Sequence, residues 1–396
     1  MNNNNKKVYD TYLDTRMQEL WDLSLYIHDN PEIAYQEYKA CEAQCSFLEG
    51  EGFDVKRNPG GLDTAFVASY GHGYPRIAVL SEYDALKELG HGCGHNLISV
   101  SALATGIVVK KYLEENKQSG EILVIGTPAE EGGGGKIKML EKNVFNNIDS
   151  VFMMHPTSDK TRLAGECMSN TRLQLTFHGK SAHAGSHPEN GLNALSAANI
   201  FLSAIGLWRQ HFKSDMRVSM IITNGGEAPG MIPDKINLAG SLSCFGKNDL
   251  EWLEKTMHKC AKGCADAFGV TLDFTSEIGY LGRIPNKVLS DVCKGELELL
   301  NEPLLDGMPA DFGGEDLGNV SREIPICNPY VTIFPEYKIS GHTEQFKELS
   351  KSEAGKRCIE ITGKSMSRSI IDLFEDNSII DESKKELANR LKKETV

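Results

Sequence analysis

Cys93 and His95 are the residues of this sequence whose types and spacing point most directly to chemistry. They stand in the segment HGCGH, between two glycines that leave the backbone free to bring both side chains to one centre. Thiolate and imidazole are preferred ligands of zinc, and imidazole also binds manganese, cobalt and nickel. The pair therefore indicates a metal site, with a structural or reactive thiol at position 93 as the alternative.

Glu130 and Glu131 form a second candidate group, placed after the apolar run Ile122–Ile125 and before four consecutive glycines. Adjacent side chains point in different directions when the chain is extended. One carboxylate could then bind a metal while its neighbour faces the substrate as a general base. The alternative is a solvated acidic turn.

His155 and His342 are two further candidate ligands, although a histidine at a strand end is often an ordinary core residue. His155 follows an apolar run, and His342 stands in the segment SGHTE. With Cys93, His95 and one glutamate, they make a plausible site for two divalent ions bridged by one group. A second glutamate and a bridging water could also be placed there.

The elements that position these residues are predicted from short apolar runs. Ile77–Leu80, Ile122–Ile125 and Val151–Met154 are each typical of a buried strand, and Leu97–Leu113 is typical of a helix. Strand–helix–strand order predicts an α/β fold with a mainly parallel sheet. Each run leads into a polar cluster, and ligand sites in such sheets gather at the carboxyl ends of strands. We therefore expect the clusters to share one cleft.

A second region begins near residue 164. Its expected elements are a strand at 171–178, a helix through 192–207, strands at 218–222 and 236–242, a helix at 249–268 and a strand at 271–274. This β-α-β-β-α-β order is typical of a small ferredoxin-like α+β domain, which we place at residues 164–282. The catalytic domain is then discontinuous, formed by residues 1–163 and 283–396.

The ends of the chain are also expected to be helical. Residues 8–50 predict two helices separated at Pro31, and the last 30 residues predict charged surface helix. A further strand is expected at Val331–Phe334, before His342.

The composition is that of an acidic globular protein. Its 396 residues include 42 basic and 55 acidic side chains, for a net charge of −13, which disfavours partners such as nucleic acid or an anionic membrane. No run of about 18 apolar residues occurs, and the first residues lack the apolar stretch of a signal peptide. We expect a cytoplasmic location, in which the ten cysteines are reduced.

Several motifs together resemble a known family, the metal-dependent amidohydrolases and metallopeptidases of aminoacylase and carboxypeptidase G type. The closest resemblance is to the branch of indoleacetyl-amino-acid hydrolases and aminobenzoyl-glutamate hydrolases. The matching stretches are HDNPEIAYQE (28–37), SEYDAL (81–86), GHGCGHN (90–96), PAEEGGGGK (128–136), MMHP (153–156), FHGKSAHAGSHPENGLNAL (177–195), GGEAPGMIPD (225–234), LGNVS (317–321) and GHTEQF (341–346). They cover most of the chain in the family's order.

The resemblance implies a role for each matched residue. Cys93 would bridge two divalent ions per chain, with zinc or manganese expected first and cobalt or nickel as alternatives. The remaining ligands would be His95, Glu131, His155 and His342. Glu130 would be the general base, and Asp84 a supporting carboxylate. An imidazolium at His183 would stabilise the oxyanion of the substrate carbonyl, in its own or a partner subunit.

The resemblance also implies an architecture. The first domain would be zinc-exopeptidase-like, and residues 164–282 would form a lid and dimerisation domain, which makes the protein a homodimer. Two positions depart from the family pattern. Gly230 and Ser243 stand where relatives often carry Asn and Arg, the Arg holding the substrate carboxylate. Arg217, Arg283 and Asn224 are the alternatives that the sequence offers for this carboxylate.

The predicted function is metal-dependent hydrolysis of an amide bond in a small N-acyl amino acid, aminobenzoyl-glutamate-like conjugate or dipeptide. A bound metal lowers the pKa of water toward about 7, and Glu130 would accept the proton and pass it to the leaving amine. One alternative is a non-catalytic binding or regulatory homologue that keeps the fold and the metal site. Another is a cysteine hydrolase in which Cys93 is the nucleophile.

Overall fold

The computed structural model describes residues 3–394, and the chain divides into two compact units. The second unit contains Cys167–Arg283 and Asp311–Gly318, and the first unit contains the rest of the chain. The sequence-based division placed residues 311–318 in the catalytic domain, which is wrong for this segment. Arg283 gives the reason, because its buried guanidinium forms ion pairs with Asp311 and Glu315 and ties the segment to the second unit.

A six-stranded sheet lies at the centre of the first unit, in the order β1-β2-β4-β3-β5-β12. Its strands are β1 (Asp54–Arg57), β2 (Phe66–His72), β3 (Arg76–Ser81), β4 (Gly120–Gly126), β5 (Ser150–Phe152) and β12 (Ile326–Cys327). The strands from β4 to β12 pair in parallel, which confirms the predicted mainly parallel sheet. The antiparallel β1 and β2 were not predicted, since β1 has no apolar run and the apolar run of β2 stops at Ala68.

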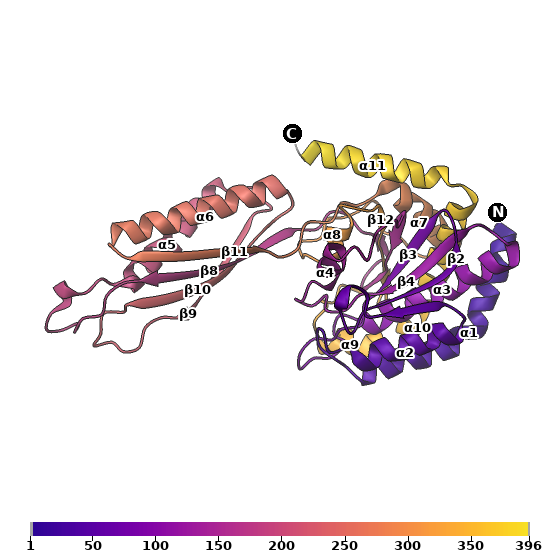
Figure 1. Cartoon of the computed structure of the whole chain (residues 1–396), viewed down its shortest axis with the longest axis horizontal. Coiled ribbons are helices and arrows are strands. Elements are labelled where there is room, and N and C mark those ends of the chain that lie inside the picture. Colours follow the sequence, from indigo (N-terminus) through magenta and orange to yellow (C-terminus); the bar gives the residue numbers. More distant parts are fainter. Residues whose placement is uncertain (1–2, 395–396) are drawn as a thin grey trace. The chain divides into compact units, whose positions relative to one another are not determined.

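Three helices of the first unit pack on one another: α1 (Asn3–Asp29), α3 (His95–Asn116) and α10 (Glu353–Glu375). Helix α3 also packs on β3 and β4 (Figure 1). Its small residues are all buried: Ser99, Ser101, Ala102, Ala104 and Gly106. The other α-helices outside residues 167–283 are α2 (Tyr38–Gly50), α4 (Gly135–Glu141), α7 (Lys287–Leu299), α8 (Leu317–Val320), α9 (Glu344–Ser350) and α11 (Ser378–Glu394). Within the described residues, no helix is long and apolar enough to cross a membrane.

The C-terminal helices differ from the predicted charged surface helix. Only α11 fits that description, whereas the second half of α10 is buried and includes Ile370, Ile371 and Phe374. The buried charge of Arg368 is compensated by ion pairs with Asp10 and Glu296. A charged residue can therefore lie inside the core, because its partners come from two other helices.

A small three-stranded sheet carries one of the candidate histidines. Its strands are β6 (His155–Thr157), β13 (Pro329–Thr332) and β7 (Arg162–Leu163), in the order β6-β13-β7. The predicted strand Val151–Met154 is shorter in the structure, because β5 ends at Phe152 and the chain leaves the large sheet. His155 therefore begins a strand of its own.

The second unit is a four-stranded antiparallel sheet with two helices packed on it and on each other. Its elements are β8 (Ser169–His178), α5 (Ala194–Trp208), β9 (Arg217–Asn224), β10 (Lys235–Cys244), α6 (Lys247–Ala267) and β11 (Thr271–Ile278). The strand order β11-β8-β10-β9 and the helix positions are those of the predicted ferredoxin-like fold (Figure 1). Leu173, Leu175 and Phe177 alternate along β8 toward the core under both helices.

Candidate metal centre

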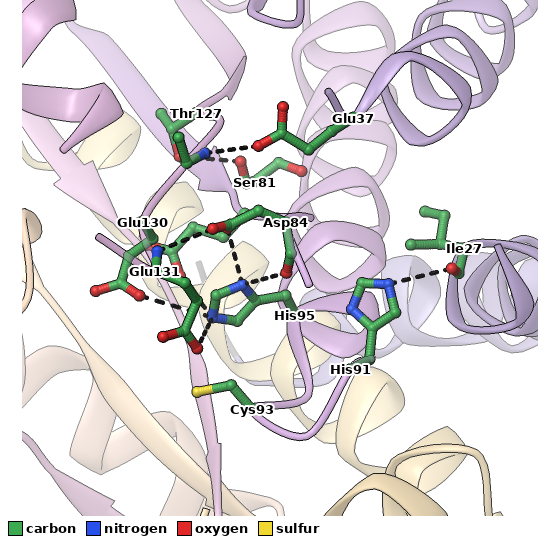
Figure 2. A network of polar contacts seen from close by, with 12 residues as sticks. Ile27, Glu37, Ser81, Asp84, His91, Cys93, His95, Thr127, Glu130 and Glu131 are labelled. Carbon is green, nitrogen blue, oxygen red and sulfur yellow. Dashed lines mark hydrogen bonds and ion pairs between the residues drawn. The ribbon is translucent and has the colours of Figure 1, made fainter. Parts of the chain in front are cut away.

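The candidate metal-binding and acid–base side chains lie in the first unit, at the ends of strands and helices. Asp84 follows β3, Cys93 and His95 stand at the start of α3, Glu130 and Glu131 follow β4, His155 begins β6, and His342 precedes α9. Because β3 and β4 are neighbouring parallel strands, their carboxyl ends open at the same edge of the sheet. Figure 2 shows Asp84, His95 and both glutamates gathered there, with Cys93 beside them.

Ligand atoms of these residues fall into three groups, within each of which they lie no more than 4.8 Å apart. The groups are Cys93–His95–His155, Cys93–Glu131–His342 and His95–Glu130–Glu131. Cys93, His95 and Glu131 each belong to two groups, so the groups overlap. This overlap is the geometry expected for two neighbouring ions that share ligands.

His95 is oriented by Asp84. Its Nδ1 lies 2.8 Å from the Asp84 carbonyl oxygen and 3.0 Å from Asp84 Oδ1, so Nδ1 carries the proton. Asp84 Oδ2 accepts a hydrogen bond of 2.8 Å from the backbone N–H of Glu131. Burial by itself raises the pKa of Asp84, but the hydrogen bond and charge of His95 lower it below its ordinary value. The carboxylate therefore links two candidate ligands and leaves His95 Nε2 free.

The surroundings of His95 Nε2 show whether these residues could hold a metal ion. It is buried and makes no hydrogen bond. The carboxylate oxygens facing it lie at 3.7 Å in Glu82, 3.9 Å in Glu131 and 4.0 Å in Glu130. Zinc lies about 2.0–2.2 Å from nitrogen and oxygen ligands, so two ligands of one ion are separated by roughly 3–4 Å. The separations are too long for hydrogen bonds and suit an ion between the ligands.

The charges of the site lead to the same conclusion. Hydrogen bonds to Cys93 and Glu131 raise the pKa of His342 to about 10. Burial lowers the pKa of His155, but the Cys93 thiolate outweighs it and raises that pKa above its ordinary value. Burial likewise raises the pKa of the Cys93 thiol, but His155 and His95 lower it to about 6. The thiol and the carboxylates of the site thus lie close enough to the imidazoles to shift their pKa values, and this mixture of sulfur, oxygen and nitrogen donors is one that a divalent ion can bind.

Glu130 and Glu131 do not diverge as neighbours on an extended chain would. Both carboxylates approach His95 Nε2, because residues 130–133 form a turn and Ala129 has a φ of 61°. Oε1 of Glu131 also lies 3.1 Å from Nε2 of His342. Only Glu131 therefore belongs to both of the groups that contain a carboxylate.

The two remaining histidines reach the site from different directions. His155 Nδ1 lies 2.8 Å from the carbonyl oxygen of Pro156, so its Nε2 faces Cys93 Sγ at 3.5 Å. Its ring stacks on Tyr330 of β13 with the ring centroids 5.0 Å apart. His342 has a φ of 60°, and its backbone N–H donates to the carbonyl oxygen of Gly92 at 2.9 Å. That contact holds the loop before α9 against the HGCGH segment.

Two buried residues beside the site were not singled out from the sequence. Glu82 and Lys136 form an ion pair, and their side chains are 1% and 0% exposed. The other oxygen of Glu82 is the one that faces His95. Glu82 stands at the same strand end as Asp84, which was the available signal. For Lys136 no local pattern indicated that a charged side chain would be buried.

His183 and Asn224 lie in the second unit. His183 is exposed, and its Nδ1 accepts hydrogen bonds from the backbone N–H groups of Gly185 and Ser186 at 3.2 and 3.0 Å. A nitrogen that accepts two such bonds carries no proton in this arrangement, so a ring proton lies on Nε2, from which His183 can donate a hydrogen bond. Asn224 lines a cavity of about 360 Å³ beside the loop that joins β9 and β10, together with Met231.

The arginines proposed as alternative carboxylate binders are both engaged. Arg283 is 1% exposed in its side chain and is held by Asp311 and Glu315, so it is not available as a surface cation. Arg217 donates to the carbonyl oxygens of Ser214 and Met216, and its guanidinium lies 5.5 Å from the centre of the Phe312 ring. Arg283 is therefore excluded in this conformation, and Arg217 would have to exchange these contacts.

Comparison with known proteins places the chain in a family. Residues 78–364 match the model of peptidase family M20/M25/M40. The chain is 33% identical to Xaa-Arg dipeptidase of Mus musculus over 96% of this chain and 92% of the relative. It is 31% identical to one of the polypeptides of p-aminobenzoyl-glutamate hydrolase from Escherichia coli, over 74% of this chain and 65% of the relative.

Further similarities agree in fold and branch. An IAA-amino acid hydrolase of Arabidopsis thaliana is 27% identical over 63% of this chain and 62% of the relative. The crystal structure of a dinuclear metal-binding peptidase of the M20 family from Bacillus subtilis superposes with a TM-score of 0.69 at 21% identity. It covers 90% of this chain and 98% of that structure. The chain therefore belongs to peptidase family M20/M25/M40, and it is a metal-dependent hydrolase.

Proposed function

We propose that this protein hydrolyses the amide bond of a dipeptide or another small N-acyl amino acid at a centre of two divalent metal ions. The observation that carries the proposal is the sharing of Cys93, His95 and Glu131 among three overlapping ligand groups. A single-ion site would need one such group, and a structural thiol would need none. The overall reaction adds water across the C–N bond, giving a carboxylate and a free amine.

The proposed ligands are those already named from the sequence. Cys93 would be shared by both ions, and the remaining ligands are His95, Glu131, His155 and His342. The ions would supply Lewis acidity and lower the pKa of water toward about 7. Each histidine presents a ring nitrogen to the site while its other nitrogen or its backbone is held by the protein, as in His95 and His155. Asp84 is proposed to hold His95 and Glu131 in position relative to each other.

Glu130 is proposed as the general base. Its carboxylate is 13% exposed and lies 4.0 Å from His95 Nε2, but it is absent from the group that contains Cys93 and His342. It is therefore the carboxylate least committed to ligation. From this position it can accept a proton from water and return that proton to the leaving amine nitrogen. His183 is proposed to donate a hydrogen bond to the substrate carbonyl through Nε2.

The substrate class is proposed from the relatives. The mouse protein that is similar over nearly the whole chain is named as a dipeptidase of Xaa-Arg substrates, and the bacterial one as a hydrolase of p-aminobenzoyl-glutamate. A dipeptide with a C-terminal basic residue is therefore the first candidate, followed by aminobenzoyl-glutamate and N-acetyl amino acids. An acidic protein of net charge −13 would favour a cationic substrate at long range.

A substrate panel with metal analysis tests the function. The purified protein is analysed for bound metal and assayed on Ala-Arg, Ala-Lys, Ala-Glu, N-acetyl-arginine and aminobenzoyl-glutamate. The assays are repeated after chelation and after addition of zinc or manganese. We expect about two ions per chain and hydrolysis that is lost on chelation and restored by metal. Bound metal without turnover would favour the binding homologue, and full activity without metal would favour Cys93 as a nucleophile.

The base is tested separately with Glu130→Gln. General-base catalysis contributes about 10²–10⁴-fold, so kcat should fall by that factor while the metal content is unchanged. Glu141→Gln, an exposed glutamate at the end of α4, is the matched control and should keep wild-type kcat. Turnover of Glu130→Gln near the wild-type rate would show that another group is the base.

Three further properties remain proposals. We propose a homodimer formed through residues 164–282, which would also act as the lid. We propose zinc or manganese as the native metal, with cobalt and nickel as alternatives, and a cytoplasmic location. Support for the dimer comes from the second unit, where β9 is an edge strand and Leu207 of α5 is 76% exposed.

A further inference from the structure

A buried glutamate outside the candidate site holds the loop that carries both catalytic-site glutamates. Glu37 stands before α2 and is fully buried. Its Oε1 accepts hydrogen bonds from the backbone N–H groups of Ala129 at 2.9 Å and Tyr35 at 3.0 Å. Its Oε2 accepts a bond of 2.8 Å from the hydroxyl of Thr64. Figure 2 shows Glu37 beside Thr127 at one end of the polar network, with Cys93 at the other end.

The backbone of Ala129, which donates to Glu37, has an unfavourable conformation. Ala129 directly precedes Glu130, and its φ of 61° lies in the left-handed region that disfavours residues with a Cβ atom. Such a residue persists only when its surroundings over-determine it. The carbonyl oxygen of Ala129 accepts bonds from Gly133 at 3.1 Å and Gly135 at 3.4 Å, which close the turn. Glu37 fixes the N–H on the other side of the same residue.

Tyr35 makes a second contact with the same loop. Its hydroxyl donates to the carbonyl oxygen of Gly133 at 2.6 Å. A Cβ atom at Gly133 would lie 2.8 Å from Tyr35 Cε2, so the ring and the loop are in close contact. Lys138 Nζ covers the ring at 4.0 Å from its centre. Tyr35 also has a φ of 61°, and its own N–H is bound by Glu37.

We propose that Glu37 and Tyr35 are positioning residues for the reaction, which set the turn at 129–133 so that Glu130 and Glu131 face His95. The inference rests on the proposed function, since that function requires Glu130 and Glu131 to lie at defined positions beside His95. Neither residue belongs to a ligand group, and both contact the turn through its backbone. Without Glu37, a buried N–H at Ala129 would lack its acceptor and the left-handed residue would lose its support.

The test compares Glu37→Ala with Glu37→Gln in the full-length, metal-loaded protein. Glutamine retains a carbonyl oxygen for the two N–H groups, whereas alanine leaves none. A displacement of about 1 Å at a reacting group can cost about 100-fold in rate. We expect kcat to fall about 100-fold in Glu37→Ala and less than about 5-fold in Glu37→Gln, with KM little changed in both.

Metal affinity provides a readout that does not depend on turnover. Displacement of Glu131 should weaken binding of zinc or manganese to the metal-free Glu37→Ala protein by about 10–100-fold, measured by calorimetric titration. Glu296→Ala is the matched control, because it also removes a buried glutamate side chain. Glu296 forms ion pairs with Lys6 and Arg368 on neighbouring helices and makes no contact with the turn. It should lower stability and leave kcat and metal affinity unchanged.

Tyr35→Phe keeps the proposal testable if Glu37→Ala does not fold. It removes only the bond to Gly133, and kcat should fall about 10-fold with metal still bound. Wild-type kcat and metal affinity in folded Glu37→Ala would overturn the proposal, as would equal losses in the alanine and glutamine variants. The failure of the proposed base is a separate result, since it appears in Glu130→Gln alone and leaves the metal affinity of the Glu37 variants as predicted.

Discussion

Cys93 is the residue on which the negative and positive groups of the site converge. Its sulfur faces His155 Nε2 at 3.5 Å and shares a ligand group with Glu131 and His342. The nearby imidazoles lower the pKa of the thiol to about 6 despite burial, so the thiolate is available at neutral pH. A thiolate among three histidines favours the proposed role of Cys93 as a metal ligand over the role of a nucleophile, because each imidazole could bind the same ion.

Removing the Cys93 side chain should therefore remove metal. In Cys93→Ala we expect the affinity for zinc to fall by more than about 100-fold and the chelator-sensitive activity to be lost, because the residue shared by two groups is gone. Metal analysis after dialysis measures the effect. Cys260→Ala, a half-buried cysteine in the second unit, is the control and should retain the wild-type metal content. An unchanged metal content in Cys93→Ala would remove Cys93 from the ligand set.

Glu37 should impose its own pH dependence on stability. Burial raises the pKa of Glu37 from its ordinary value of 4.5 to about 7, and the negative charge of Asp84 adds to the effect. A carboxyl whose pKa is raised in the folded state stabilises the fold most below pH 4.5, and this contribution is lost as the pH rises through 7. The loss is on the order of 3 kcal/mol.

Glu37→Gln has no such titration. The free energy of unfolding of the variant, relative to wild type, should therefore rise by up to about 3 kcal/mol between pH 4.5 and about 8. Urea unfolding at several pH values in this range measures the difference. A difference that does not change with pH would mean that Glu37 titrates at the same pH in the folded and unfolded chain.

At the scale of elements, helix α3 links the metal centre to the sheet. It begins at His95 and packs on β3 and β4, with Gly106 beside Val124 of β4. Gly94, just before it, has a φ of 76°, and a Cβ atom there would lie 2.7 Å from Pro156 Cγ. The start of the helix is thus pressed against the strand that carries His155. Small residues stand where another element comes close, as Gly106 does beside β4, while larger aliphatic residues such as Leu97 and Leu103 fill the rest of the buried surface of the helix.

Gly106→Ala tests this packing. A Cβ atom at Gly106 would lie 2.5 Å from Val124 Cγ2 of β4, so overpacking should outweigh the gain in helix propensity. We expect a loss of about 1–3 kcal/mol in the free energy of unfolding, measured with urea. Gly295→Ala in α7 has nothing within 4 Å of the new atom and should be stabilising by about 0.5–1 kcal/mol. Equal effects of the two substitutions would contradict the close approach of α3 and β4.

At the scale of the whole molecule, the second unit presents apolar side chains that nothing in the described chain covers. Ile200 and Leu207 lie seven residues apart on α5, two turns along one helix face, and are 50% and 76% exposed. Ile221 on the edge strand β9 is 64% exposed. A second copy of the chain is the partner that the family resemblance implies for this unit.

Leu207→Glu should therefore convert the proposed dimer to a monomer. A charge in an apolar interface without a partner is strongly unfavourable, so dissociation should be visible by sedimentation or light scattering at micromolar concentration. Leu299→Glu, at a 52% exposed leucine of the first unit, is the control and should leave the mass unchanged. A wild-type protein that is monomeric at high concentration would refute the dimer itself.

The sequence by itself determined the chemical types of the site and the order of most elements. A strand such as β3 or a helix such as α3 is specified by a local run of side chains, so hydropathy and residue size were sufficient to predict it. The ferredoxin-like order of the second unit followed in the same way. Cys93, His95 and the glutamate pair could be singled out because their neighbours are glycines and strand ends.

Only the tertiary structure decided how these groups meet. The turn that brings Glu130 and Glu131 to the same ring depends on Glu37, which lies 92 residues before Ala129 in the chain. The buried ion pair of Glu82 and Lys136 and the tautomers of His95 and His183 also depend on partners supplied by other segments. A local pattern carries no record of such partners, because burial and hydrogen bonding are set by what packs against a residue.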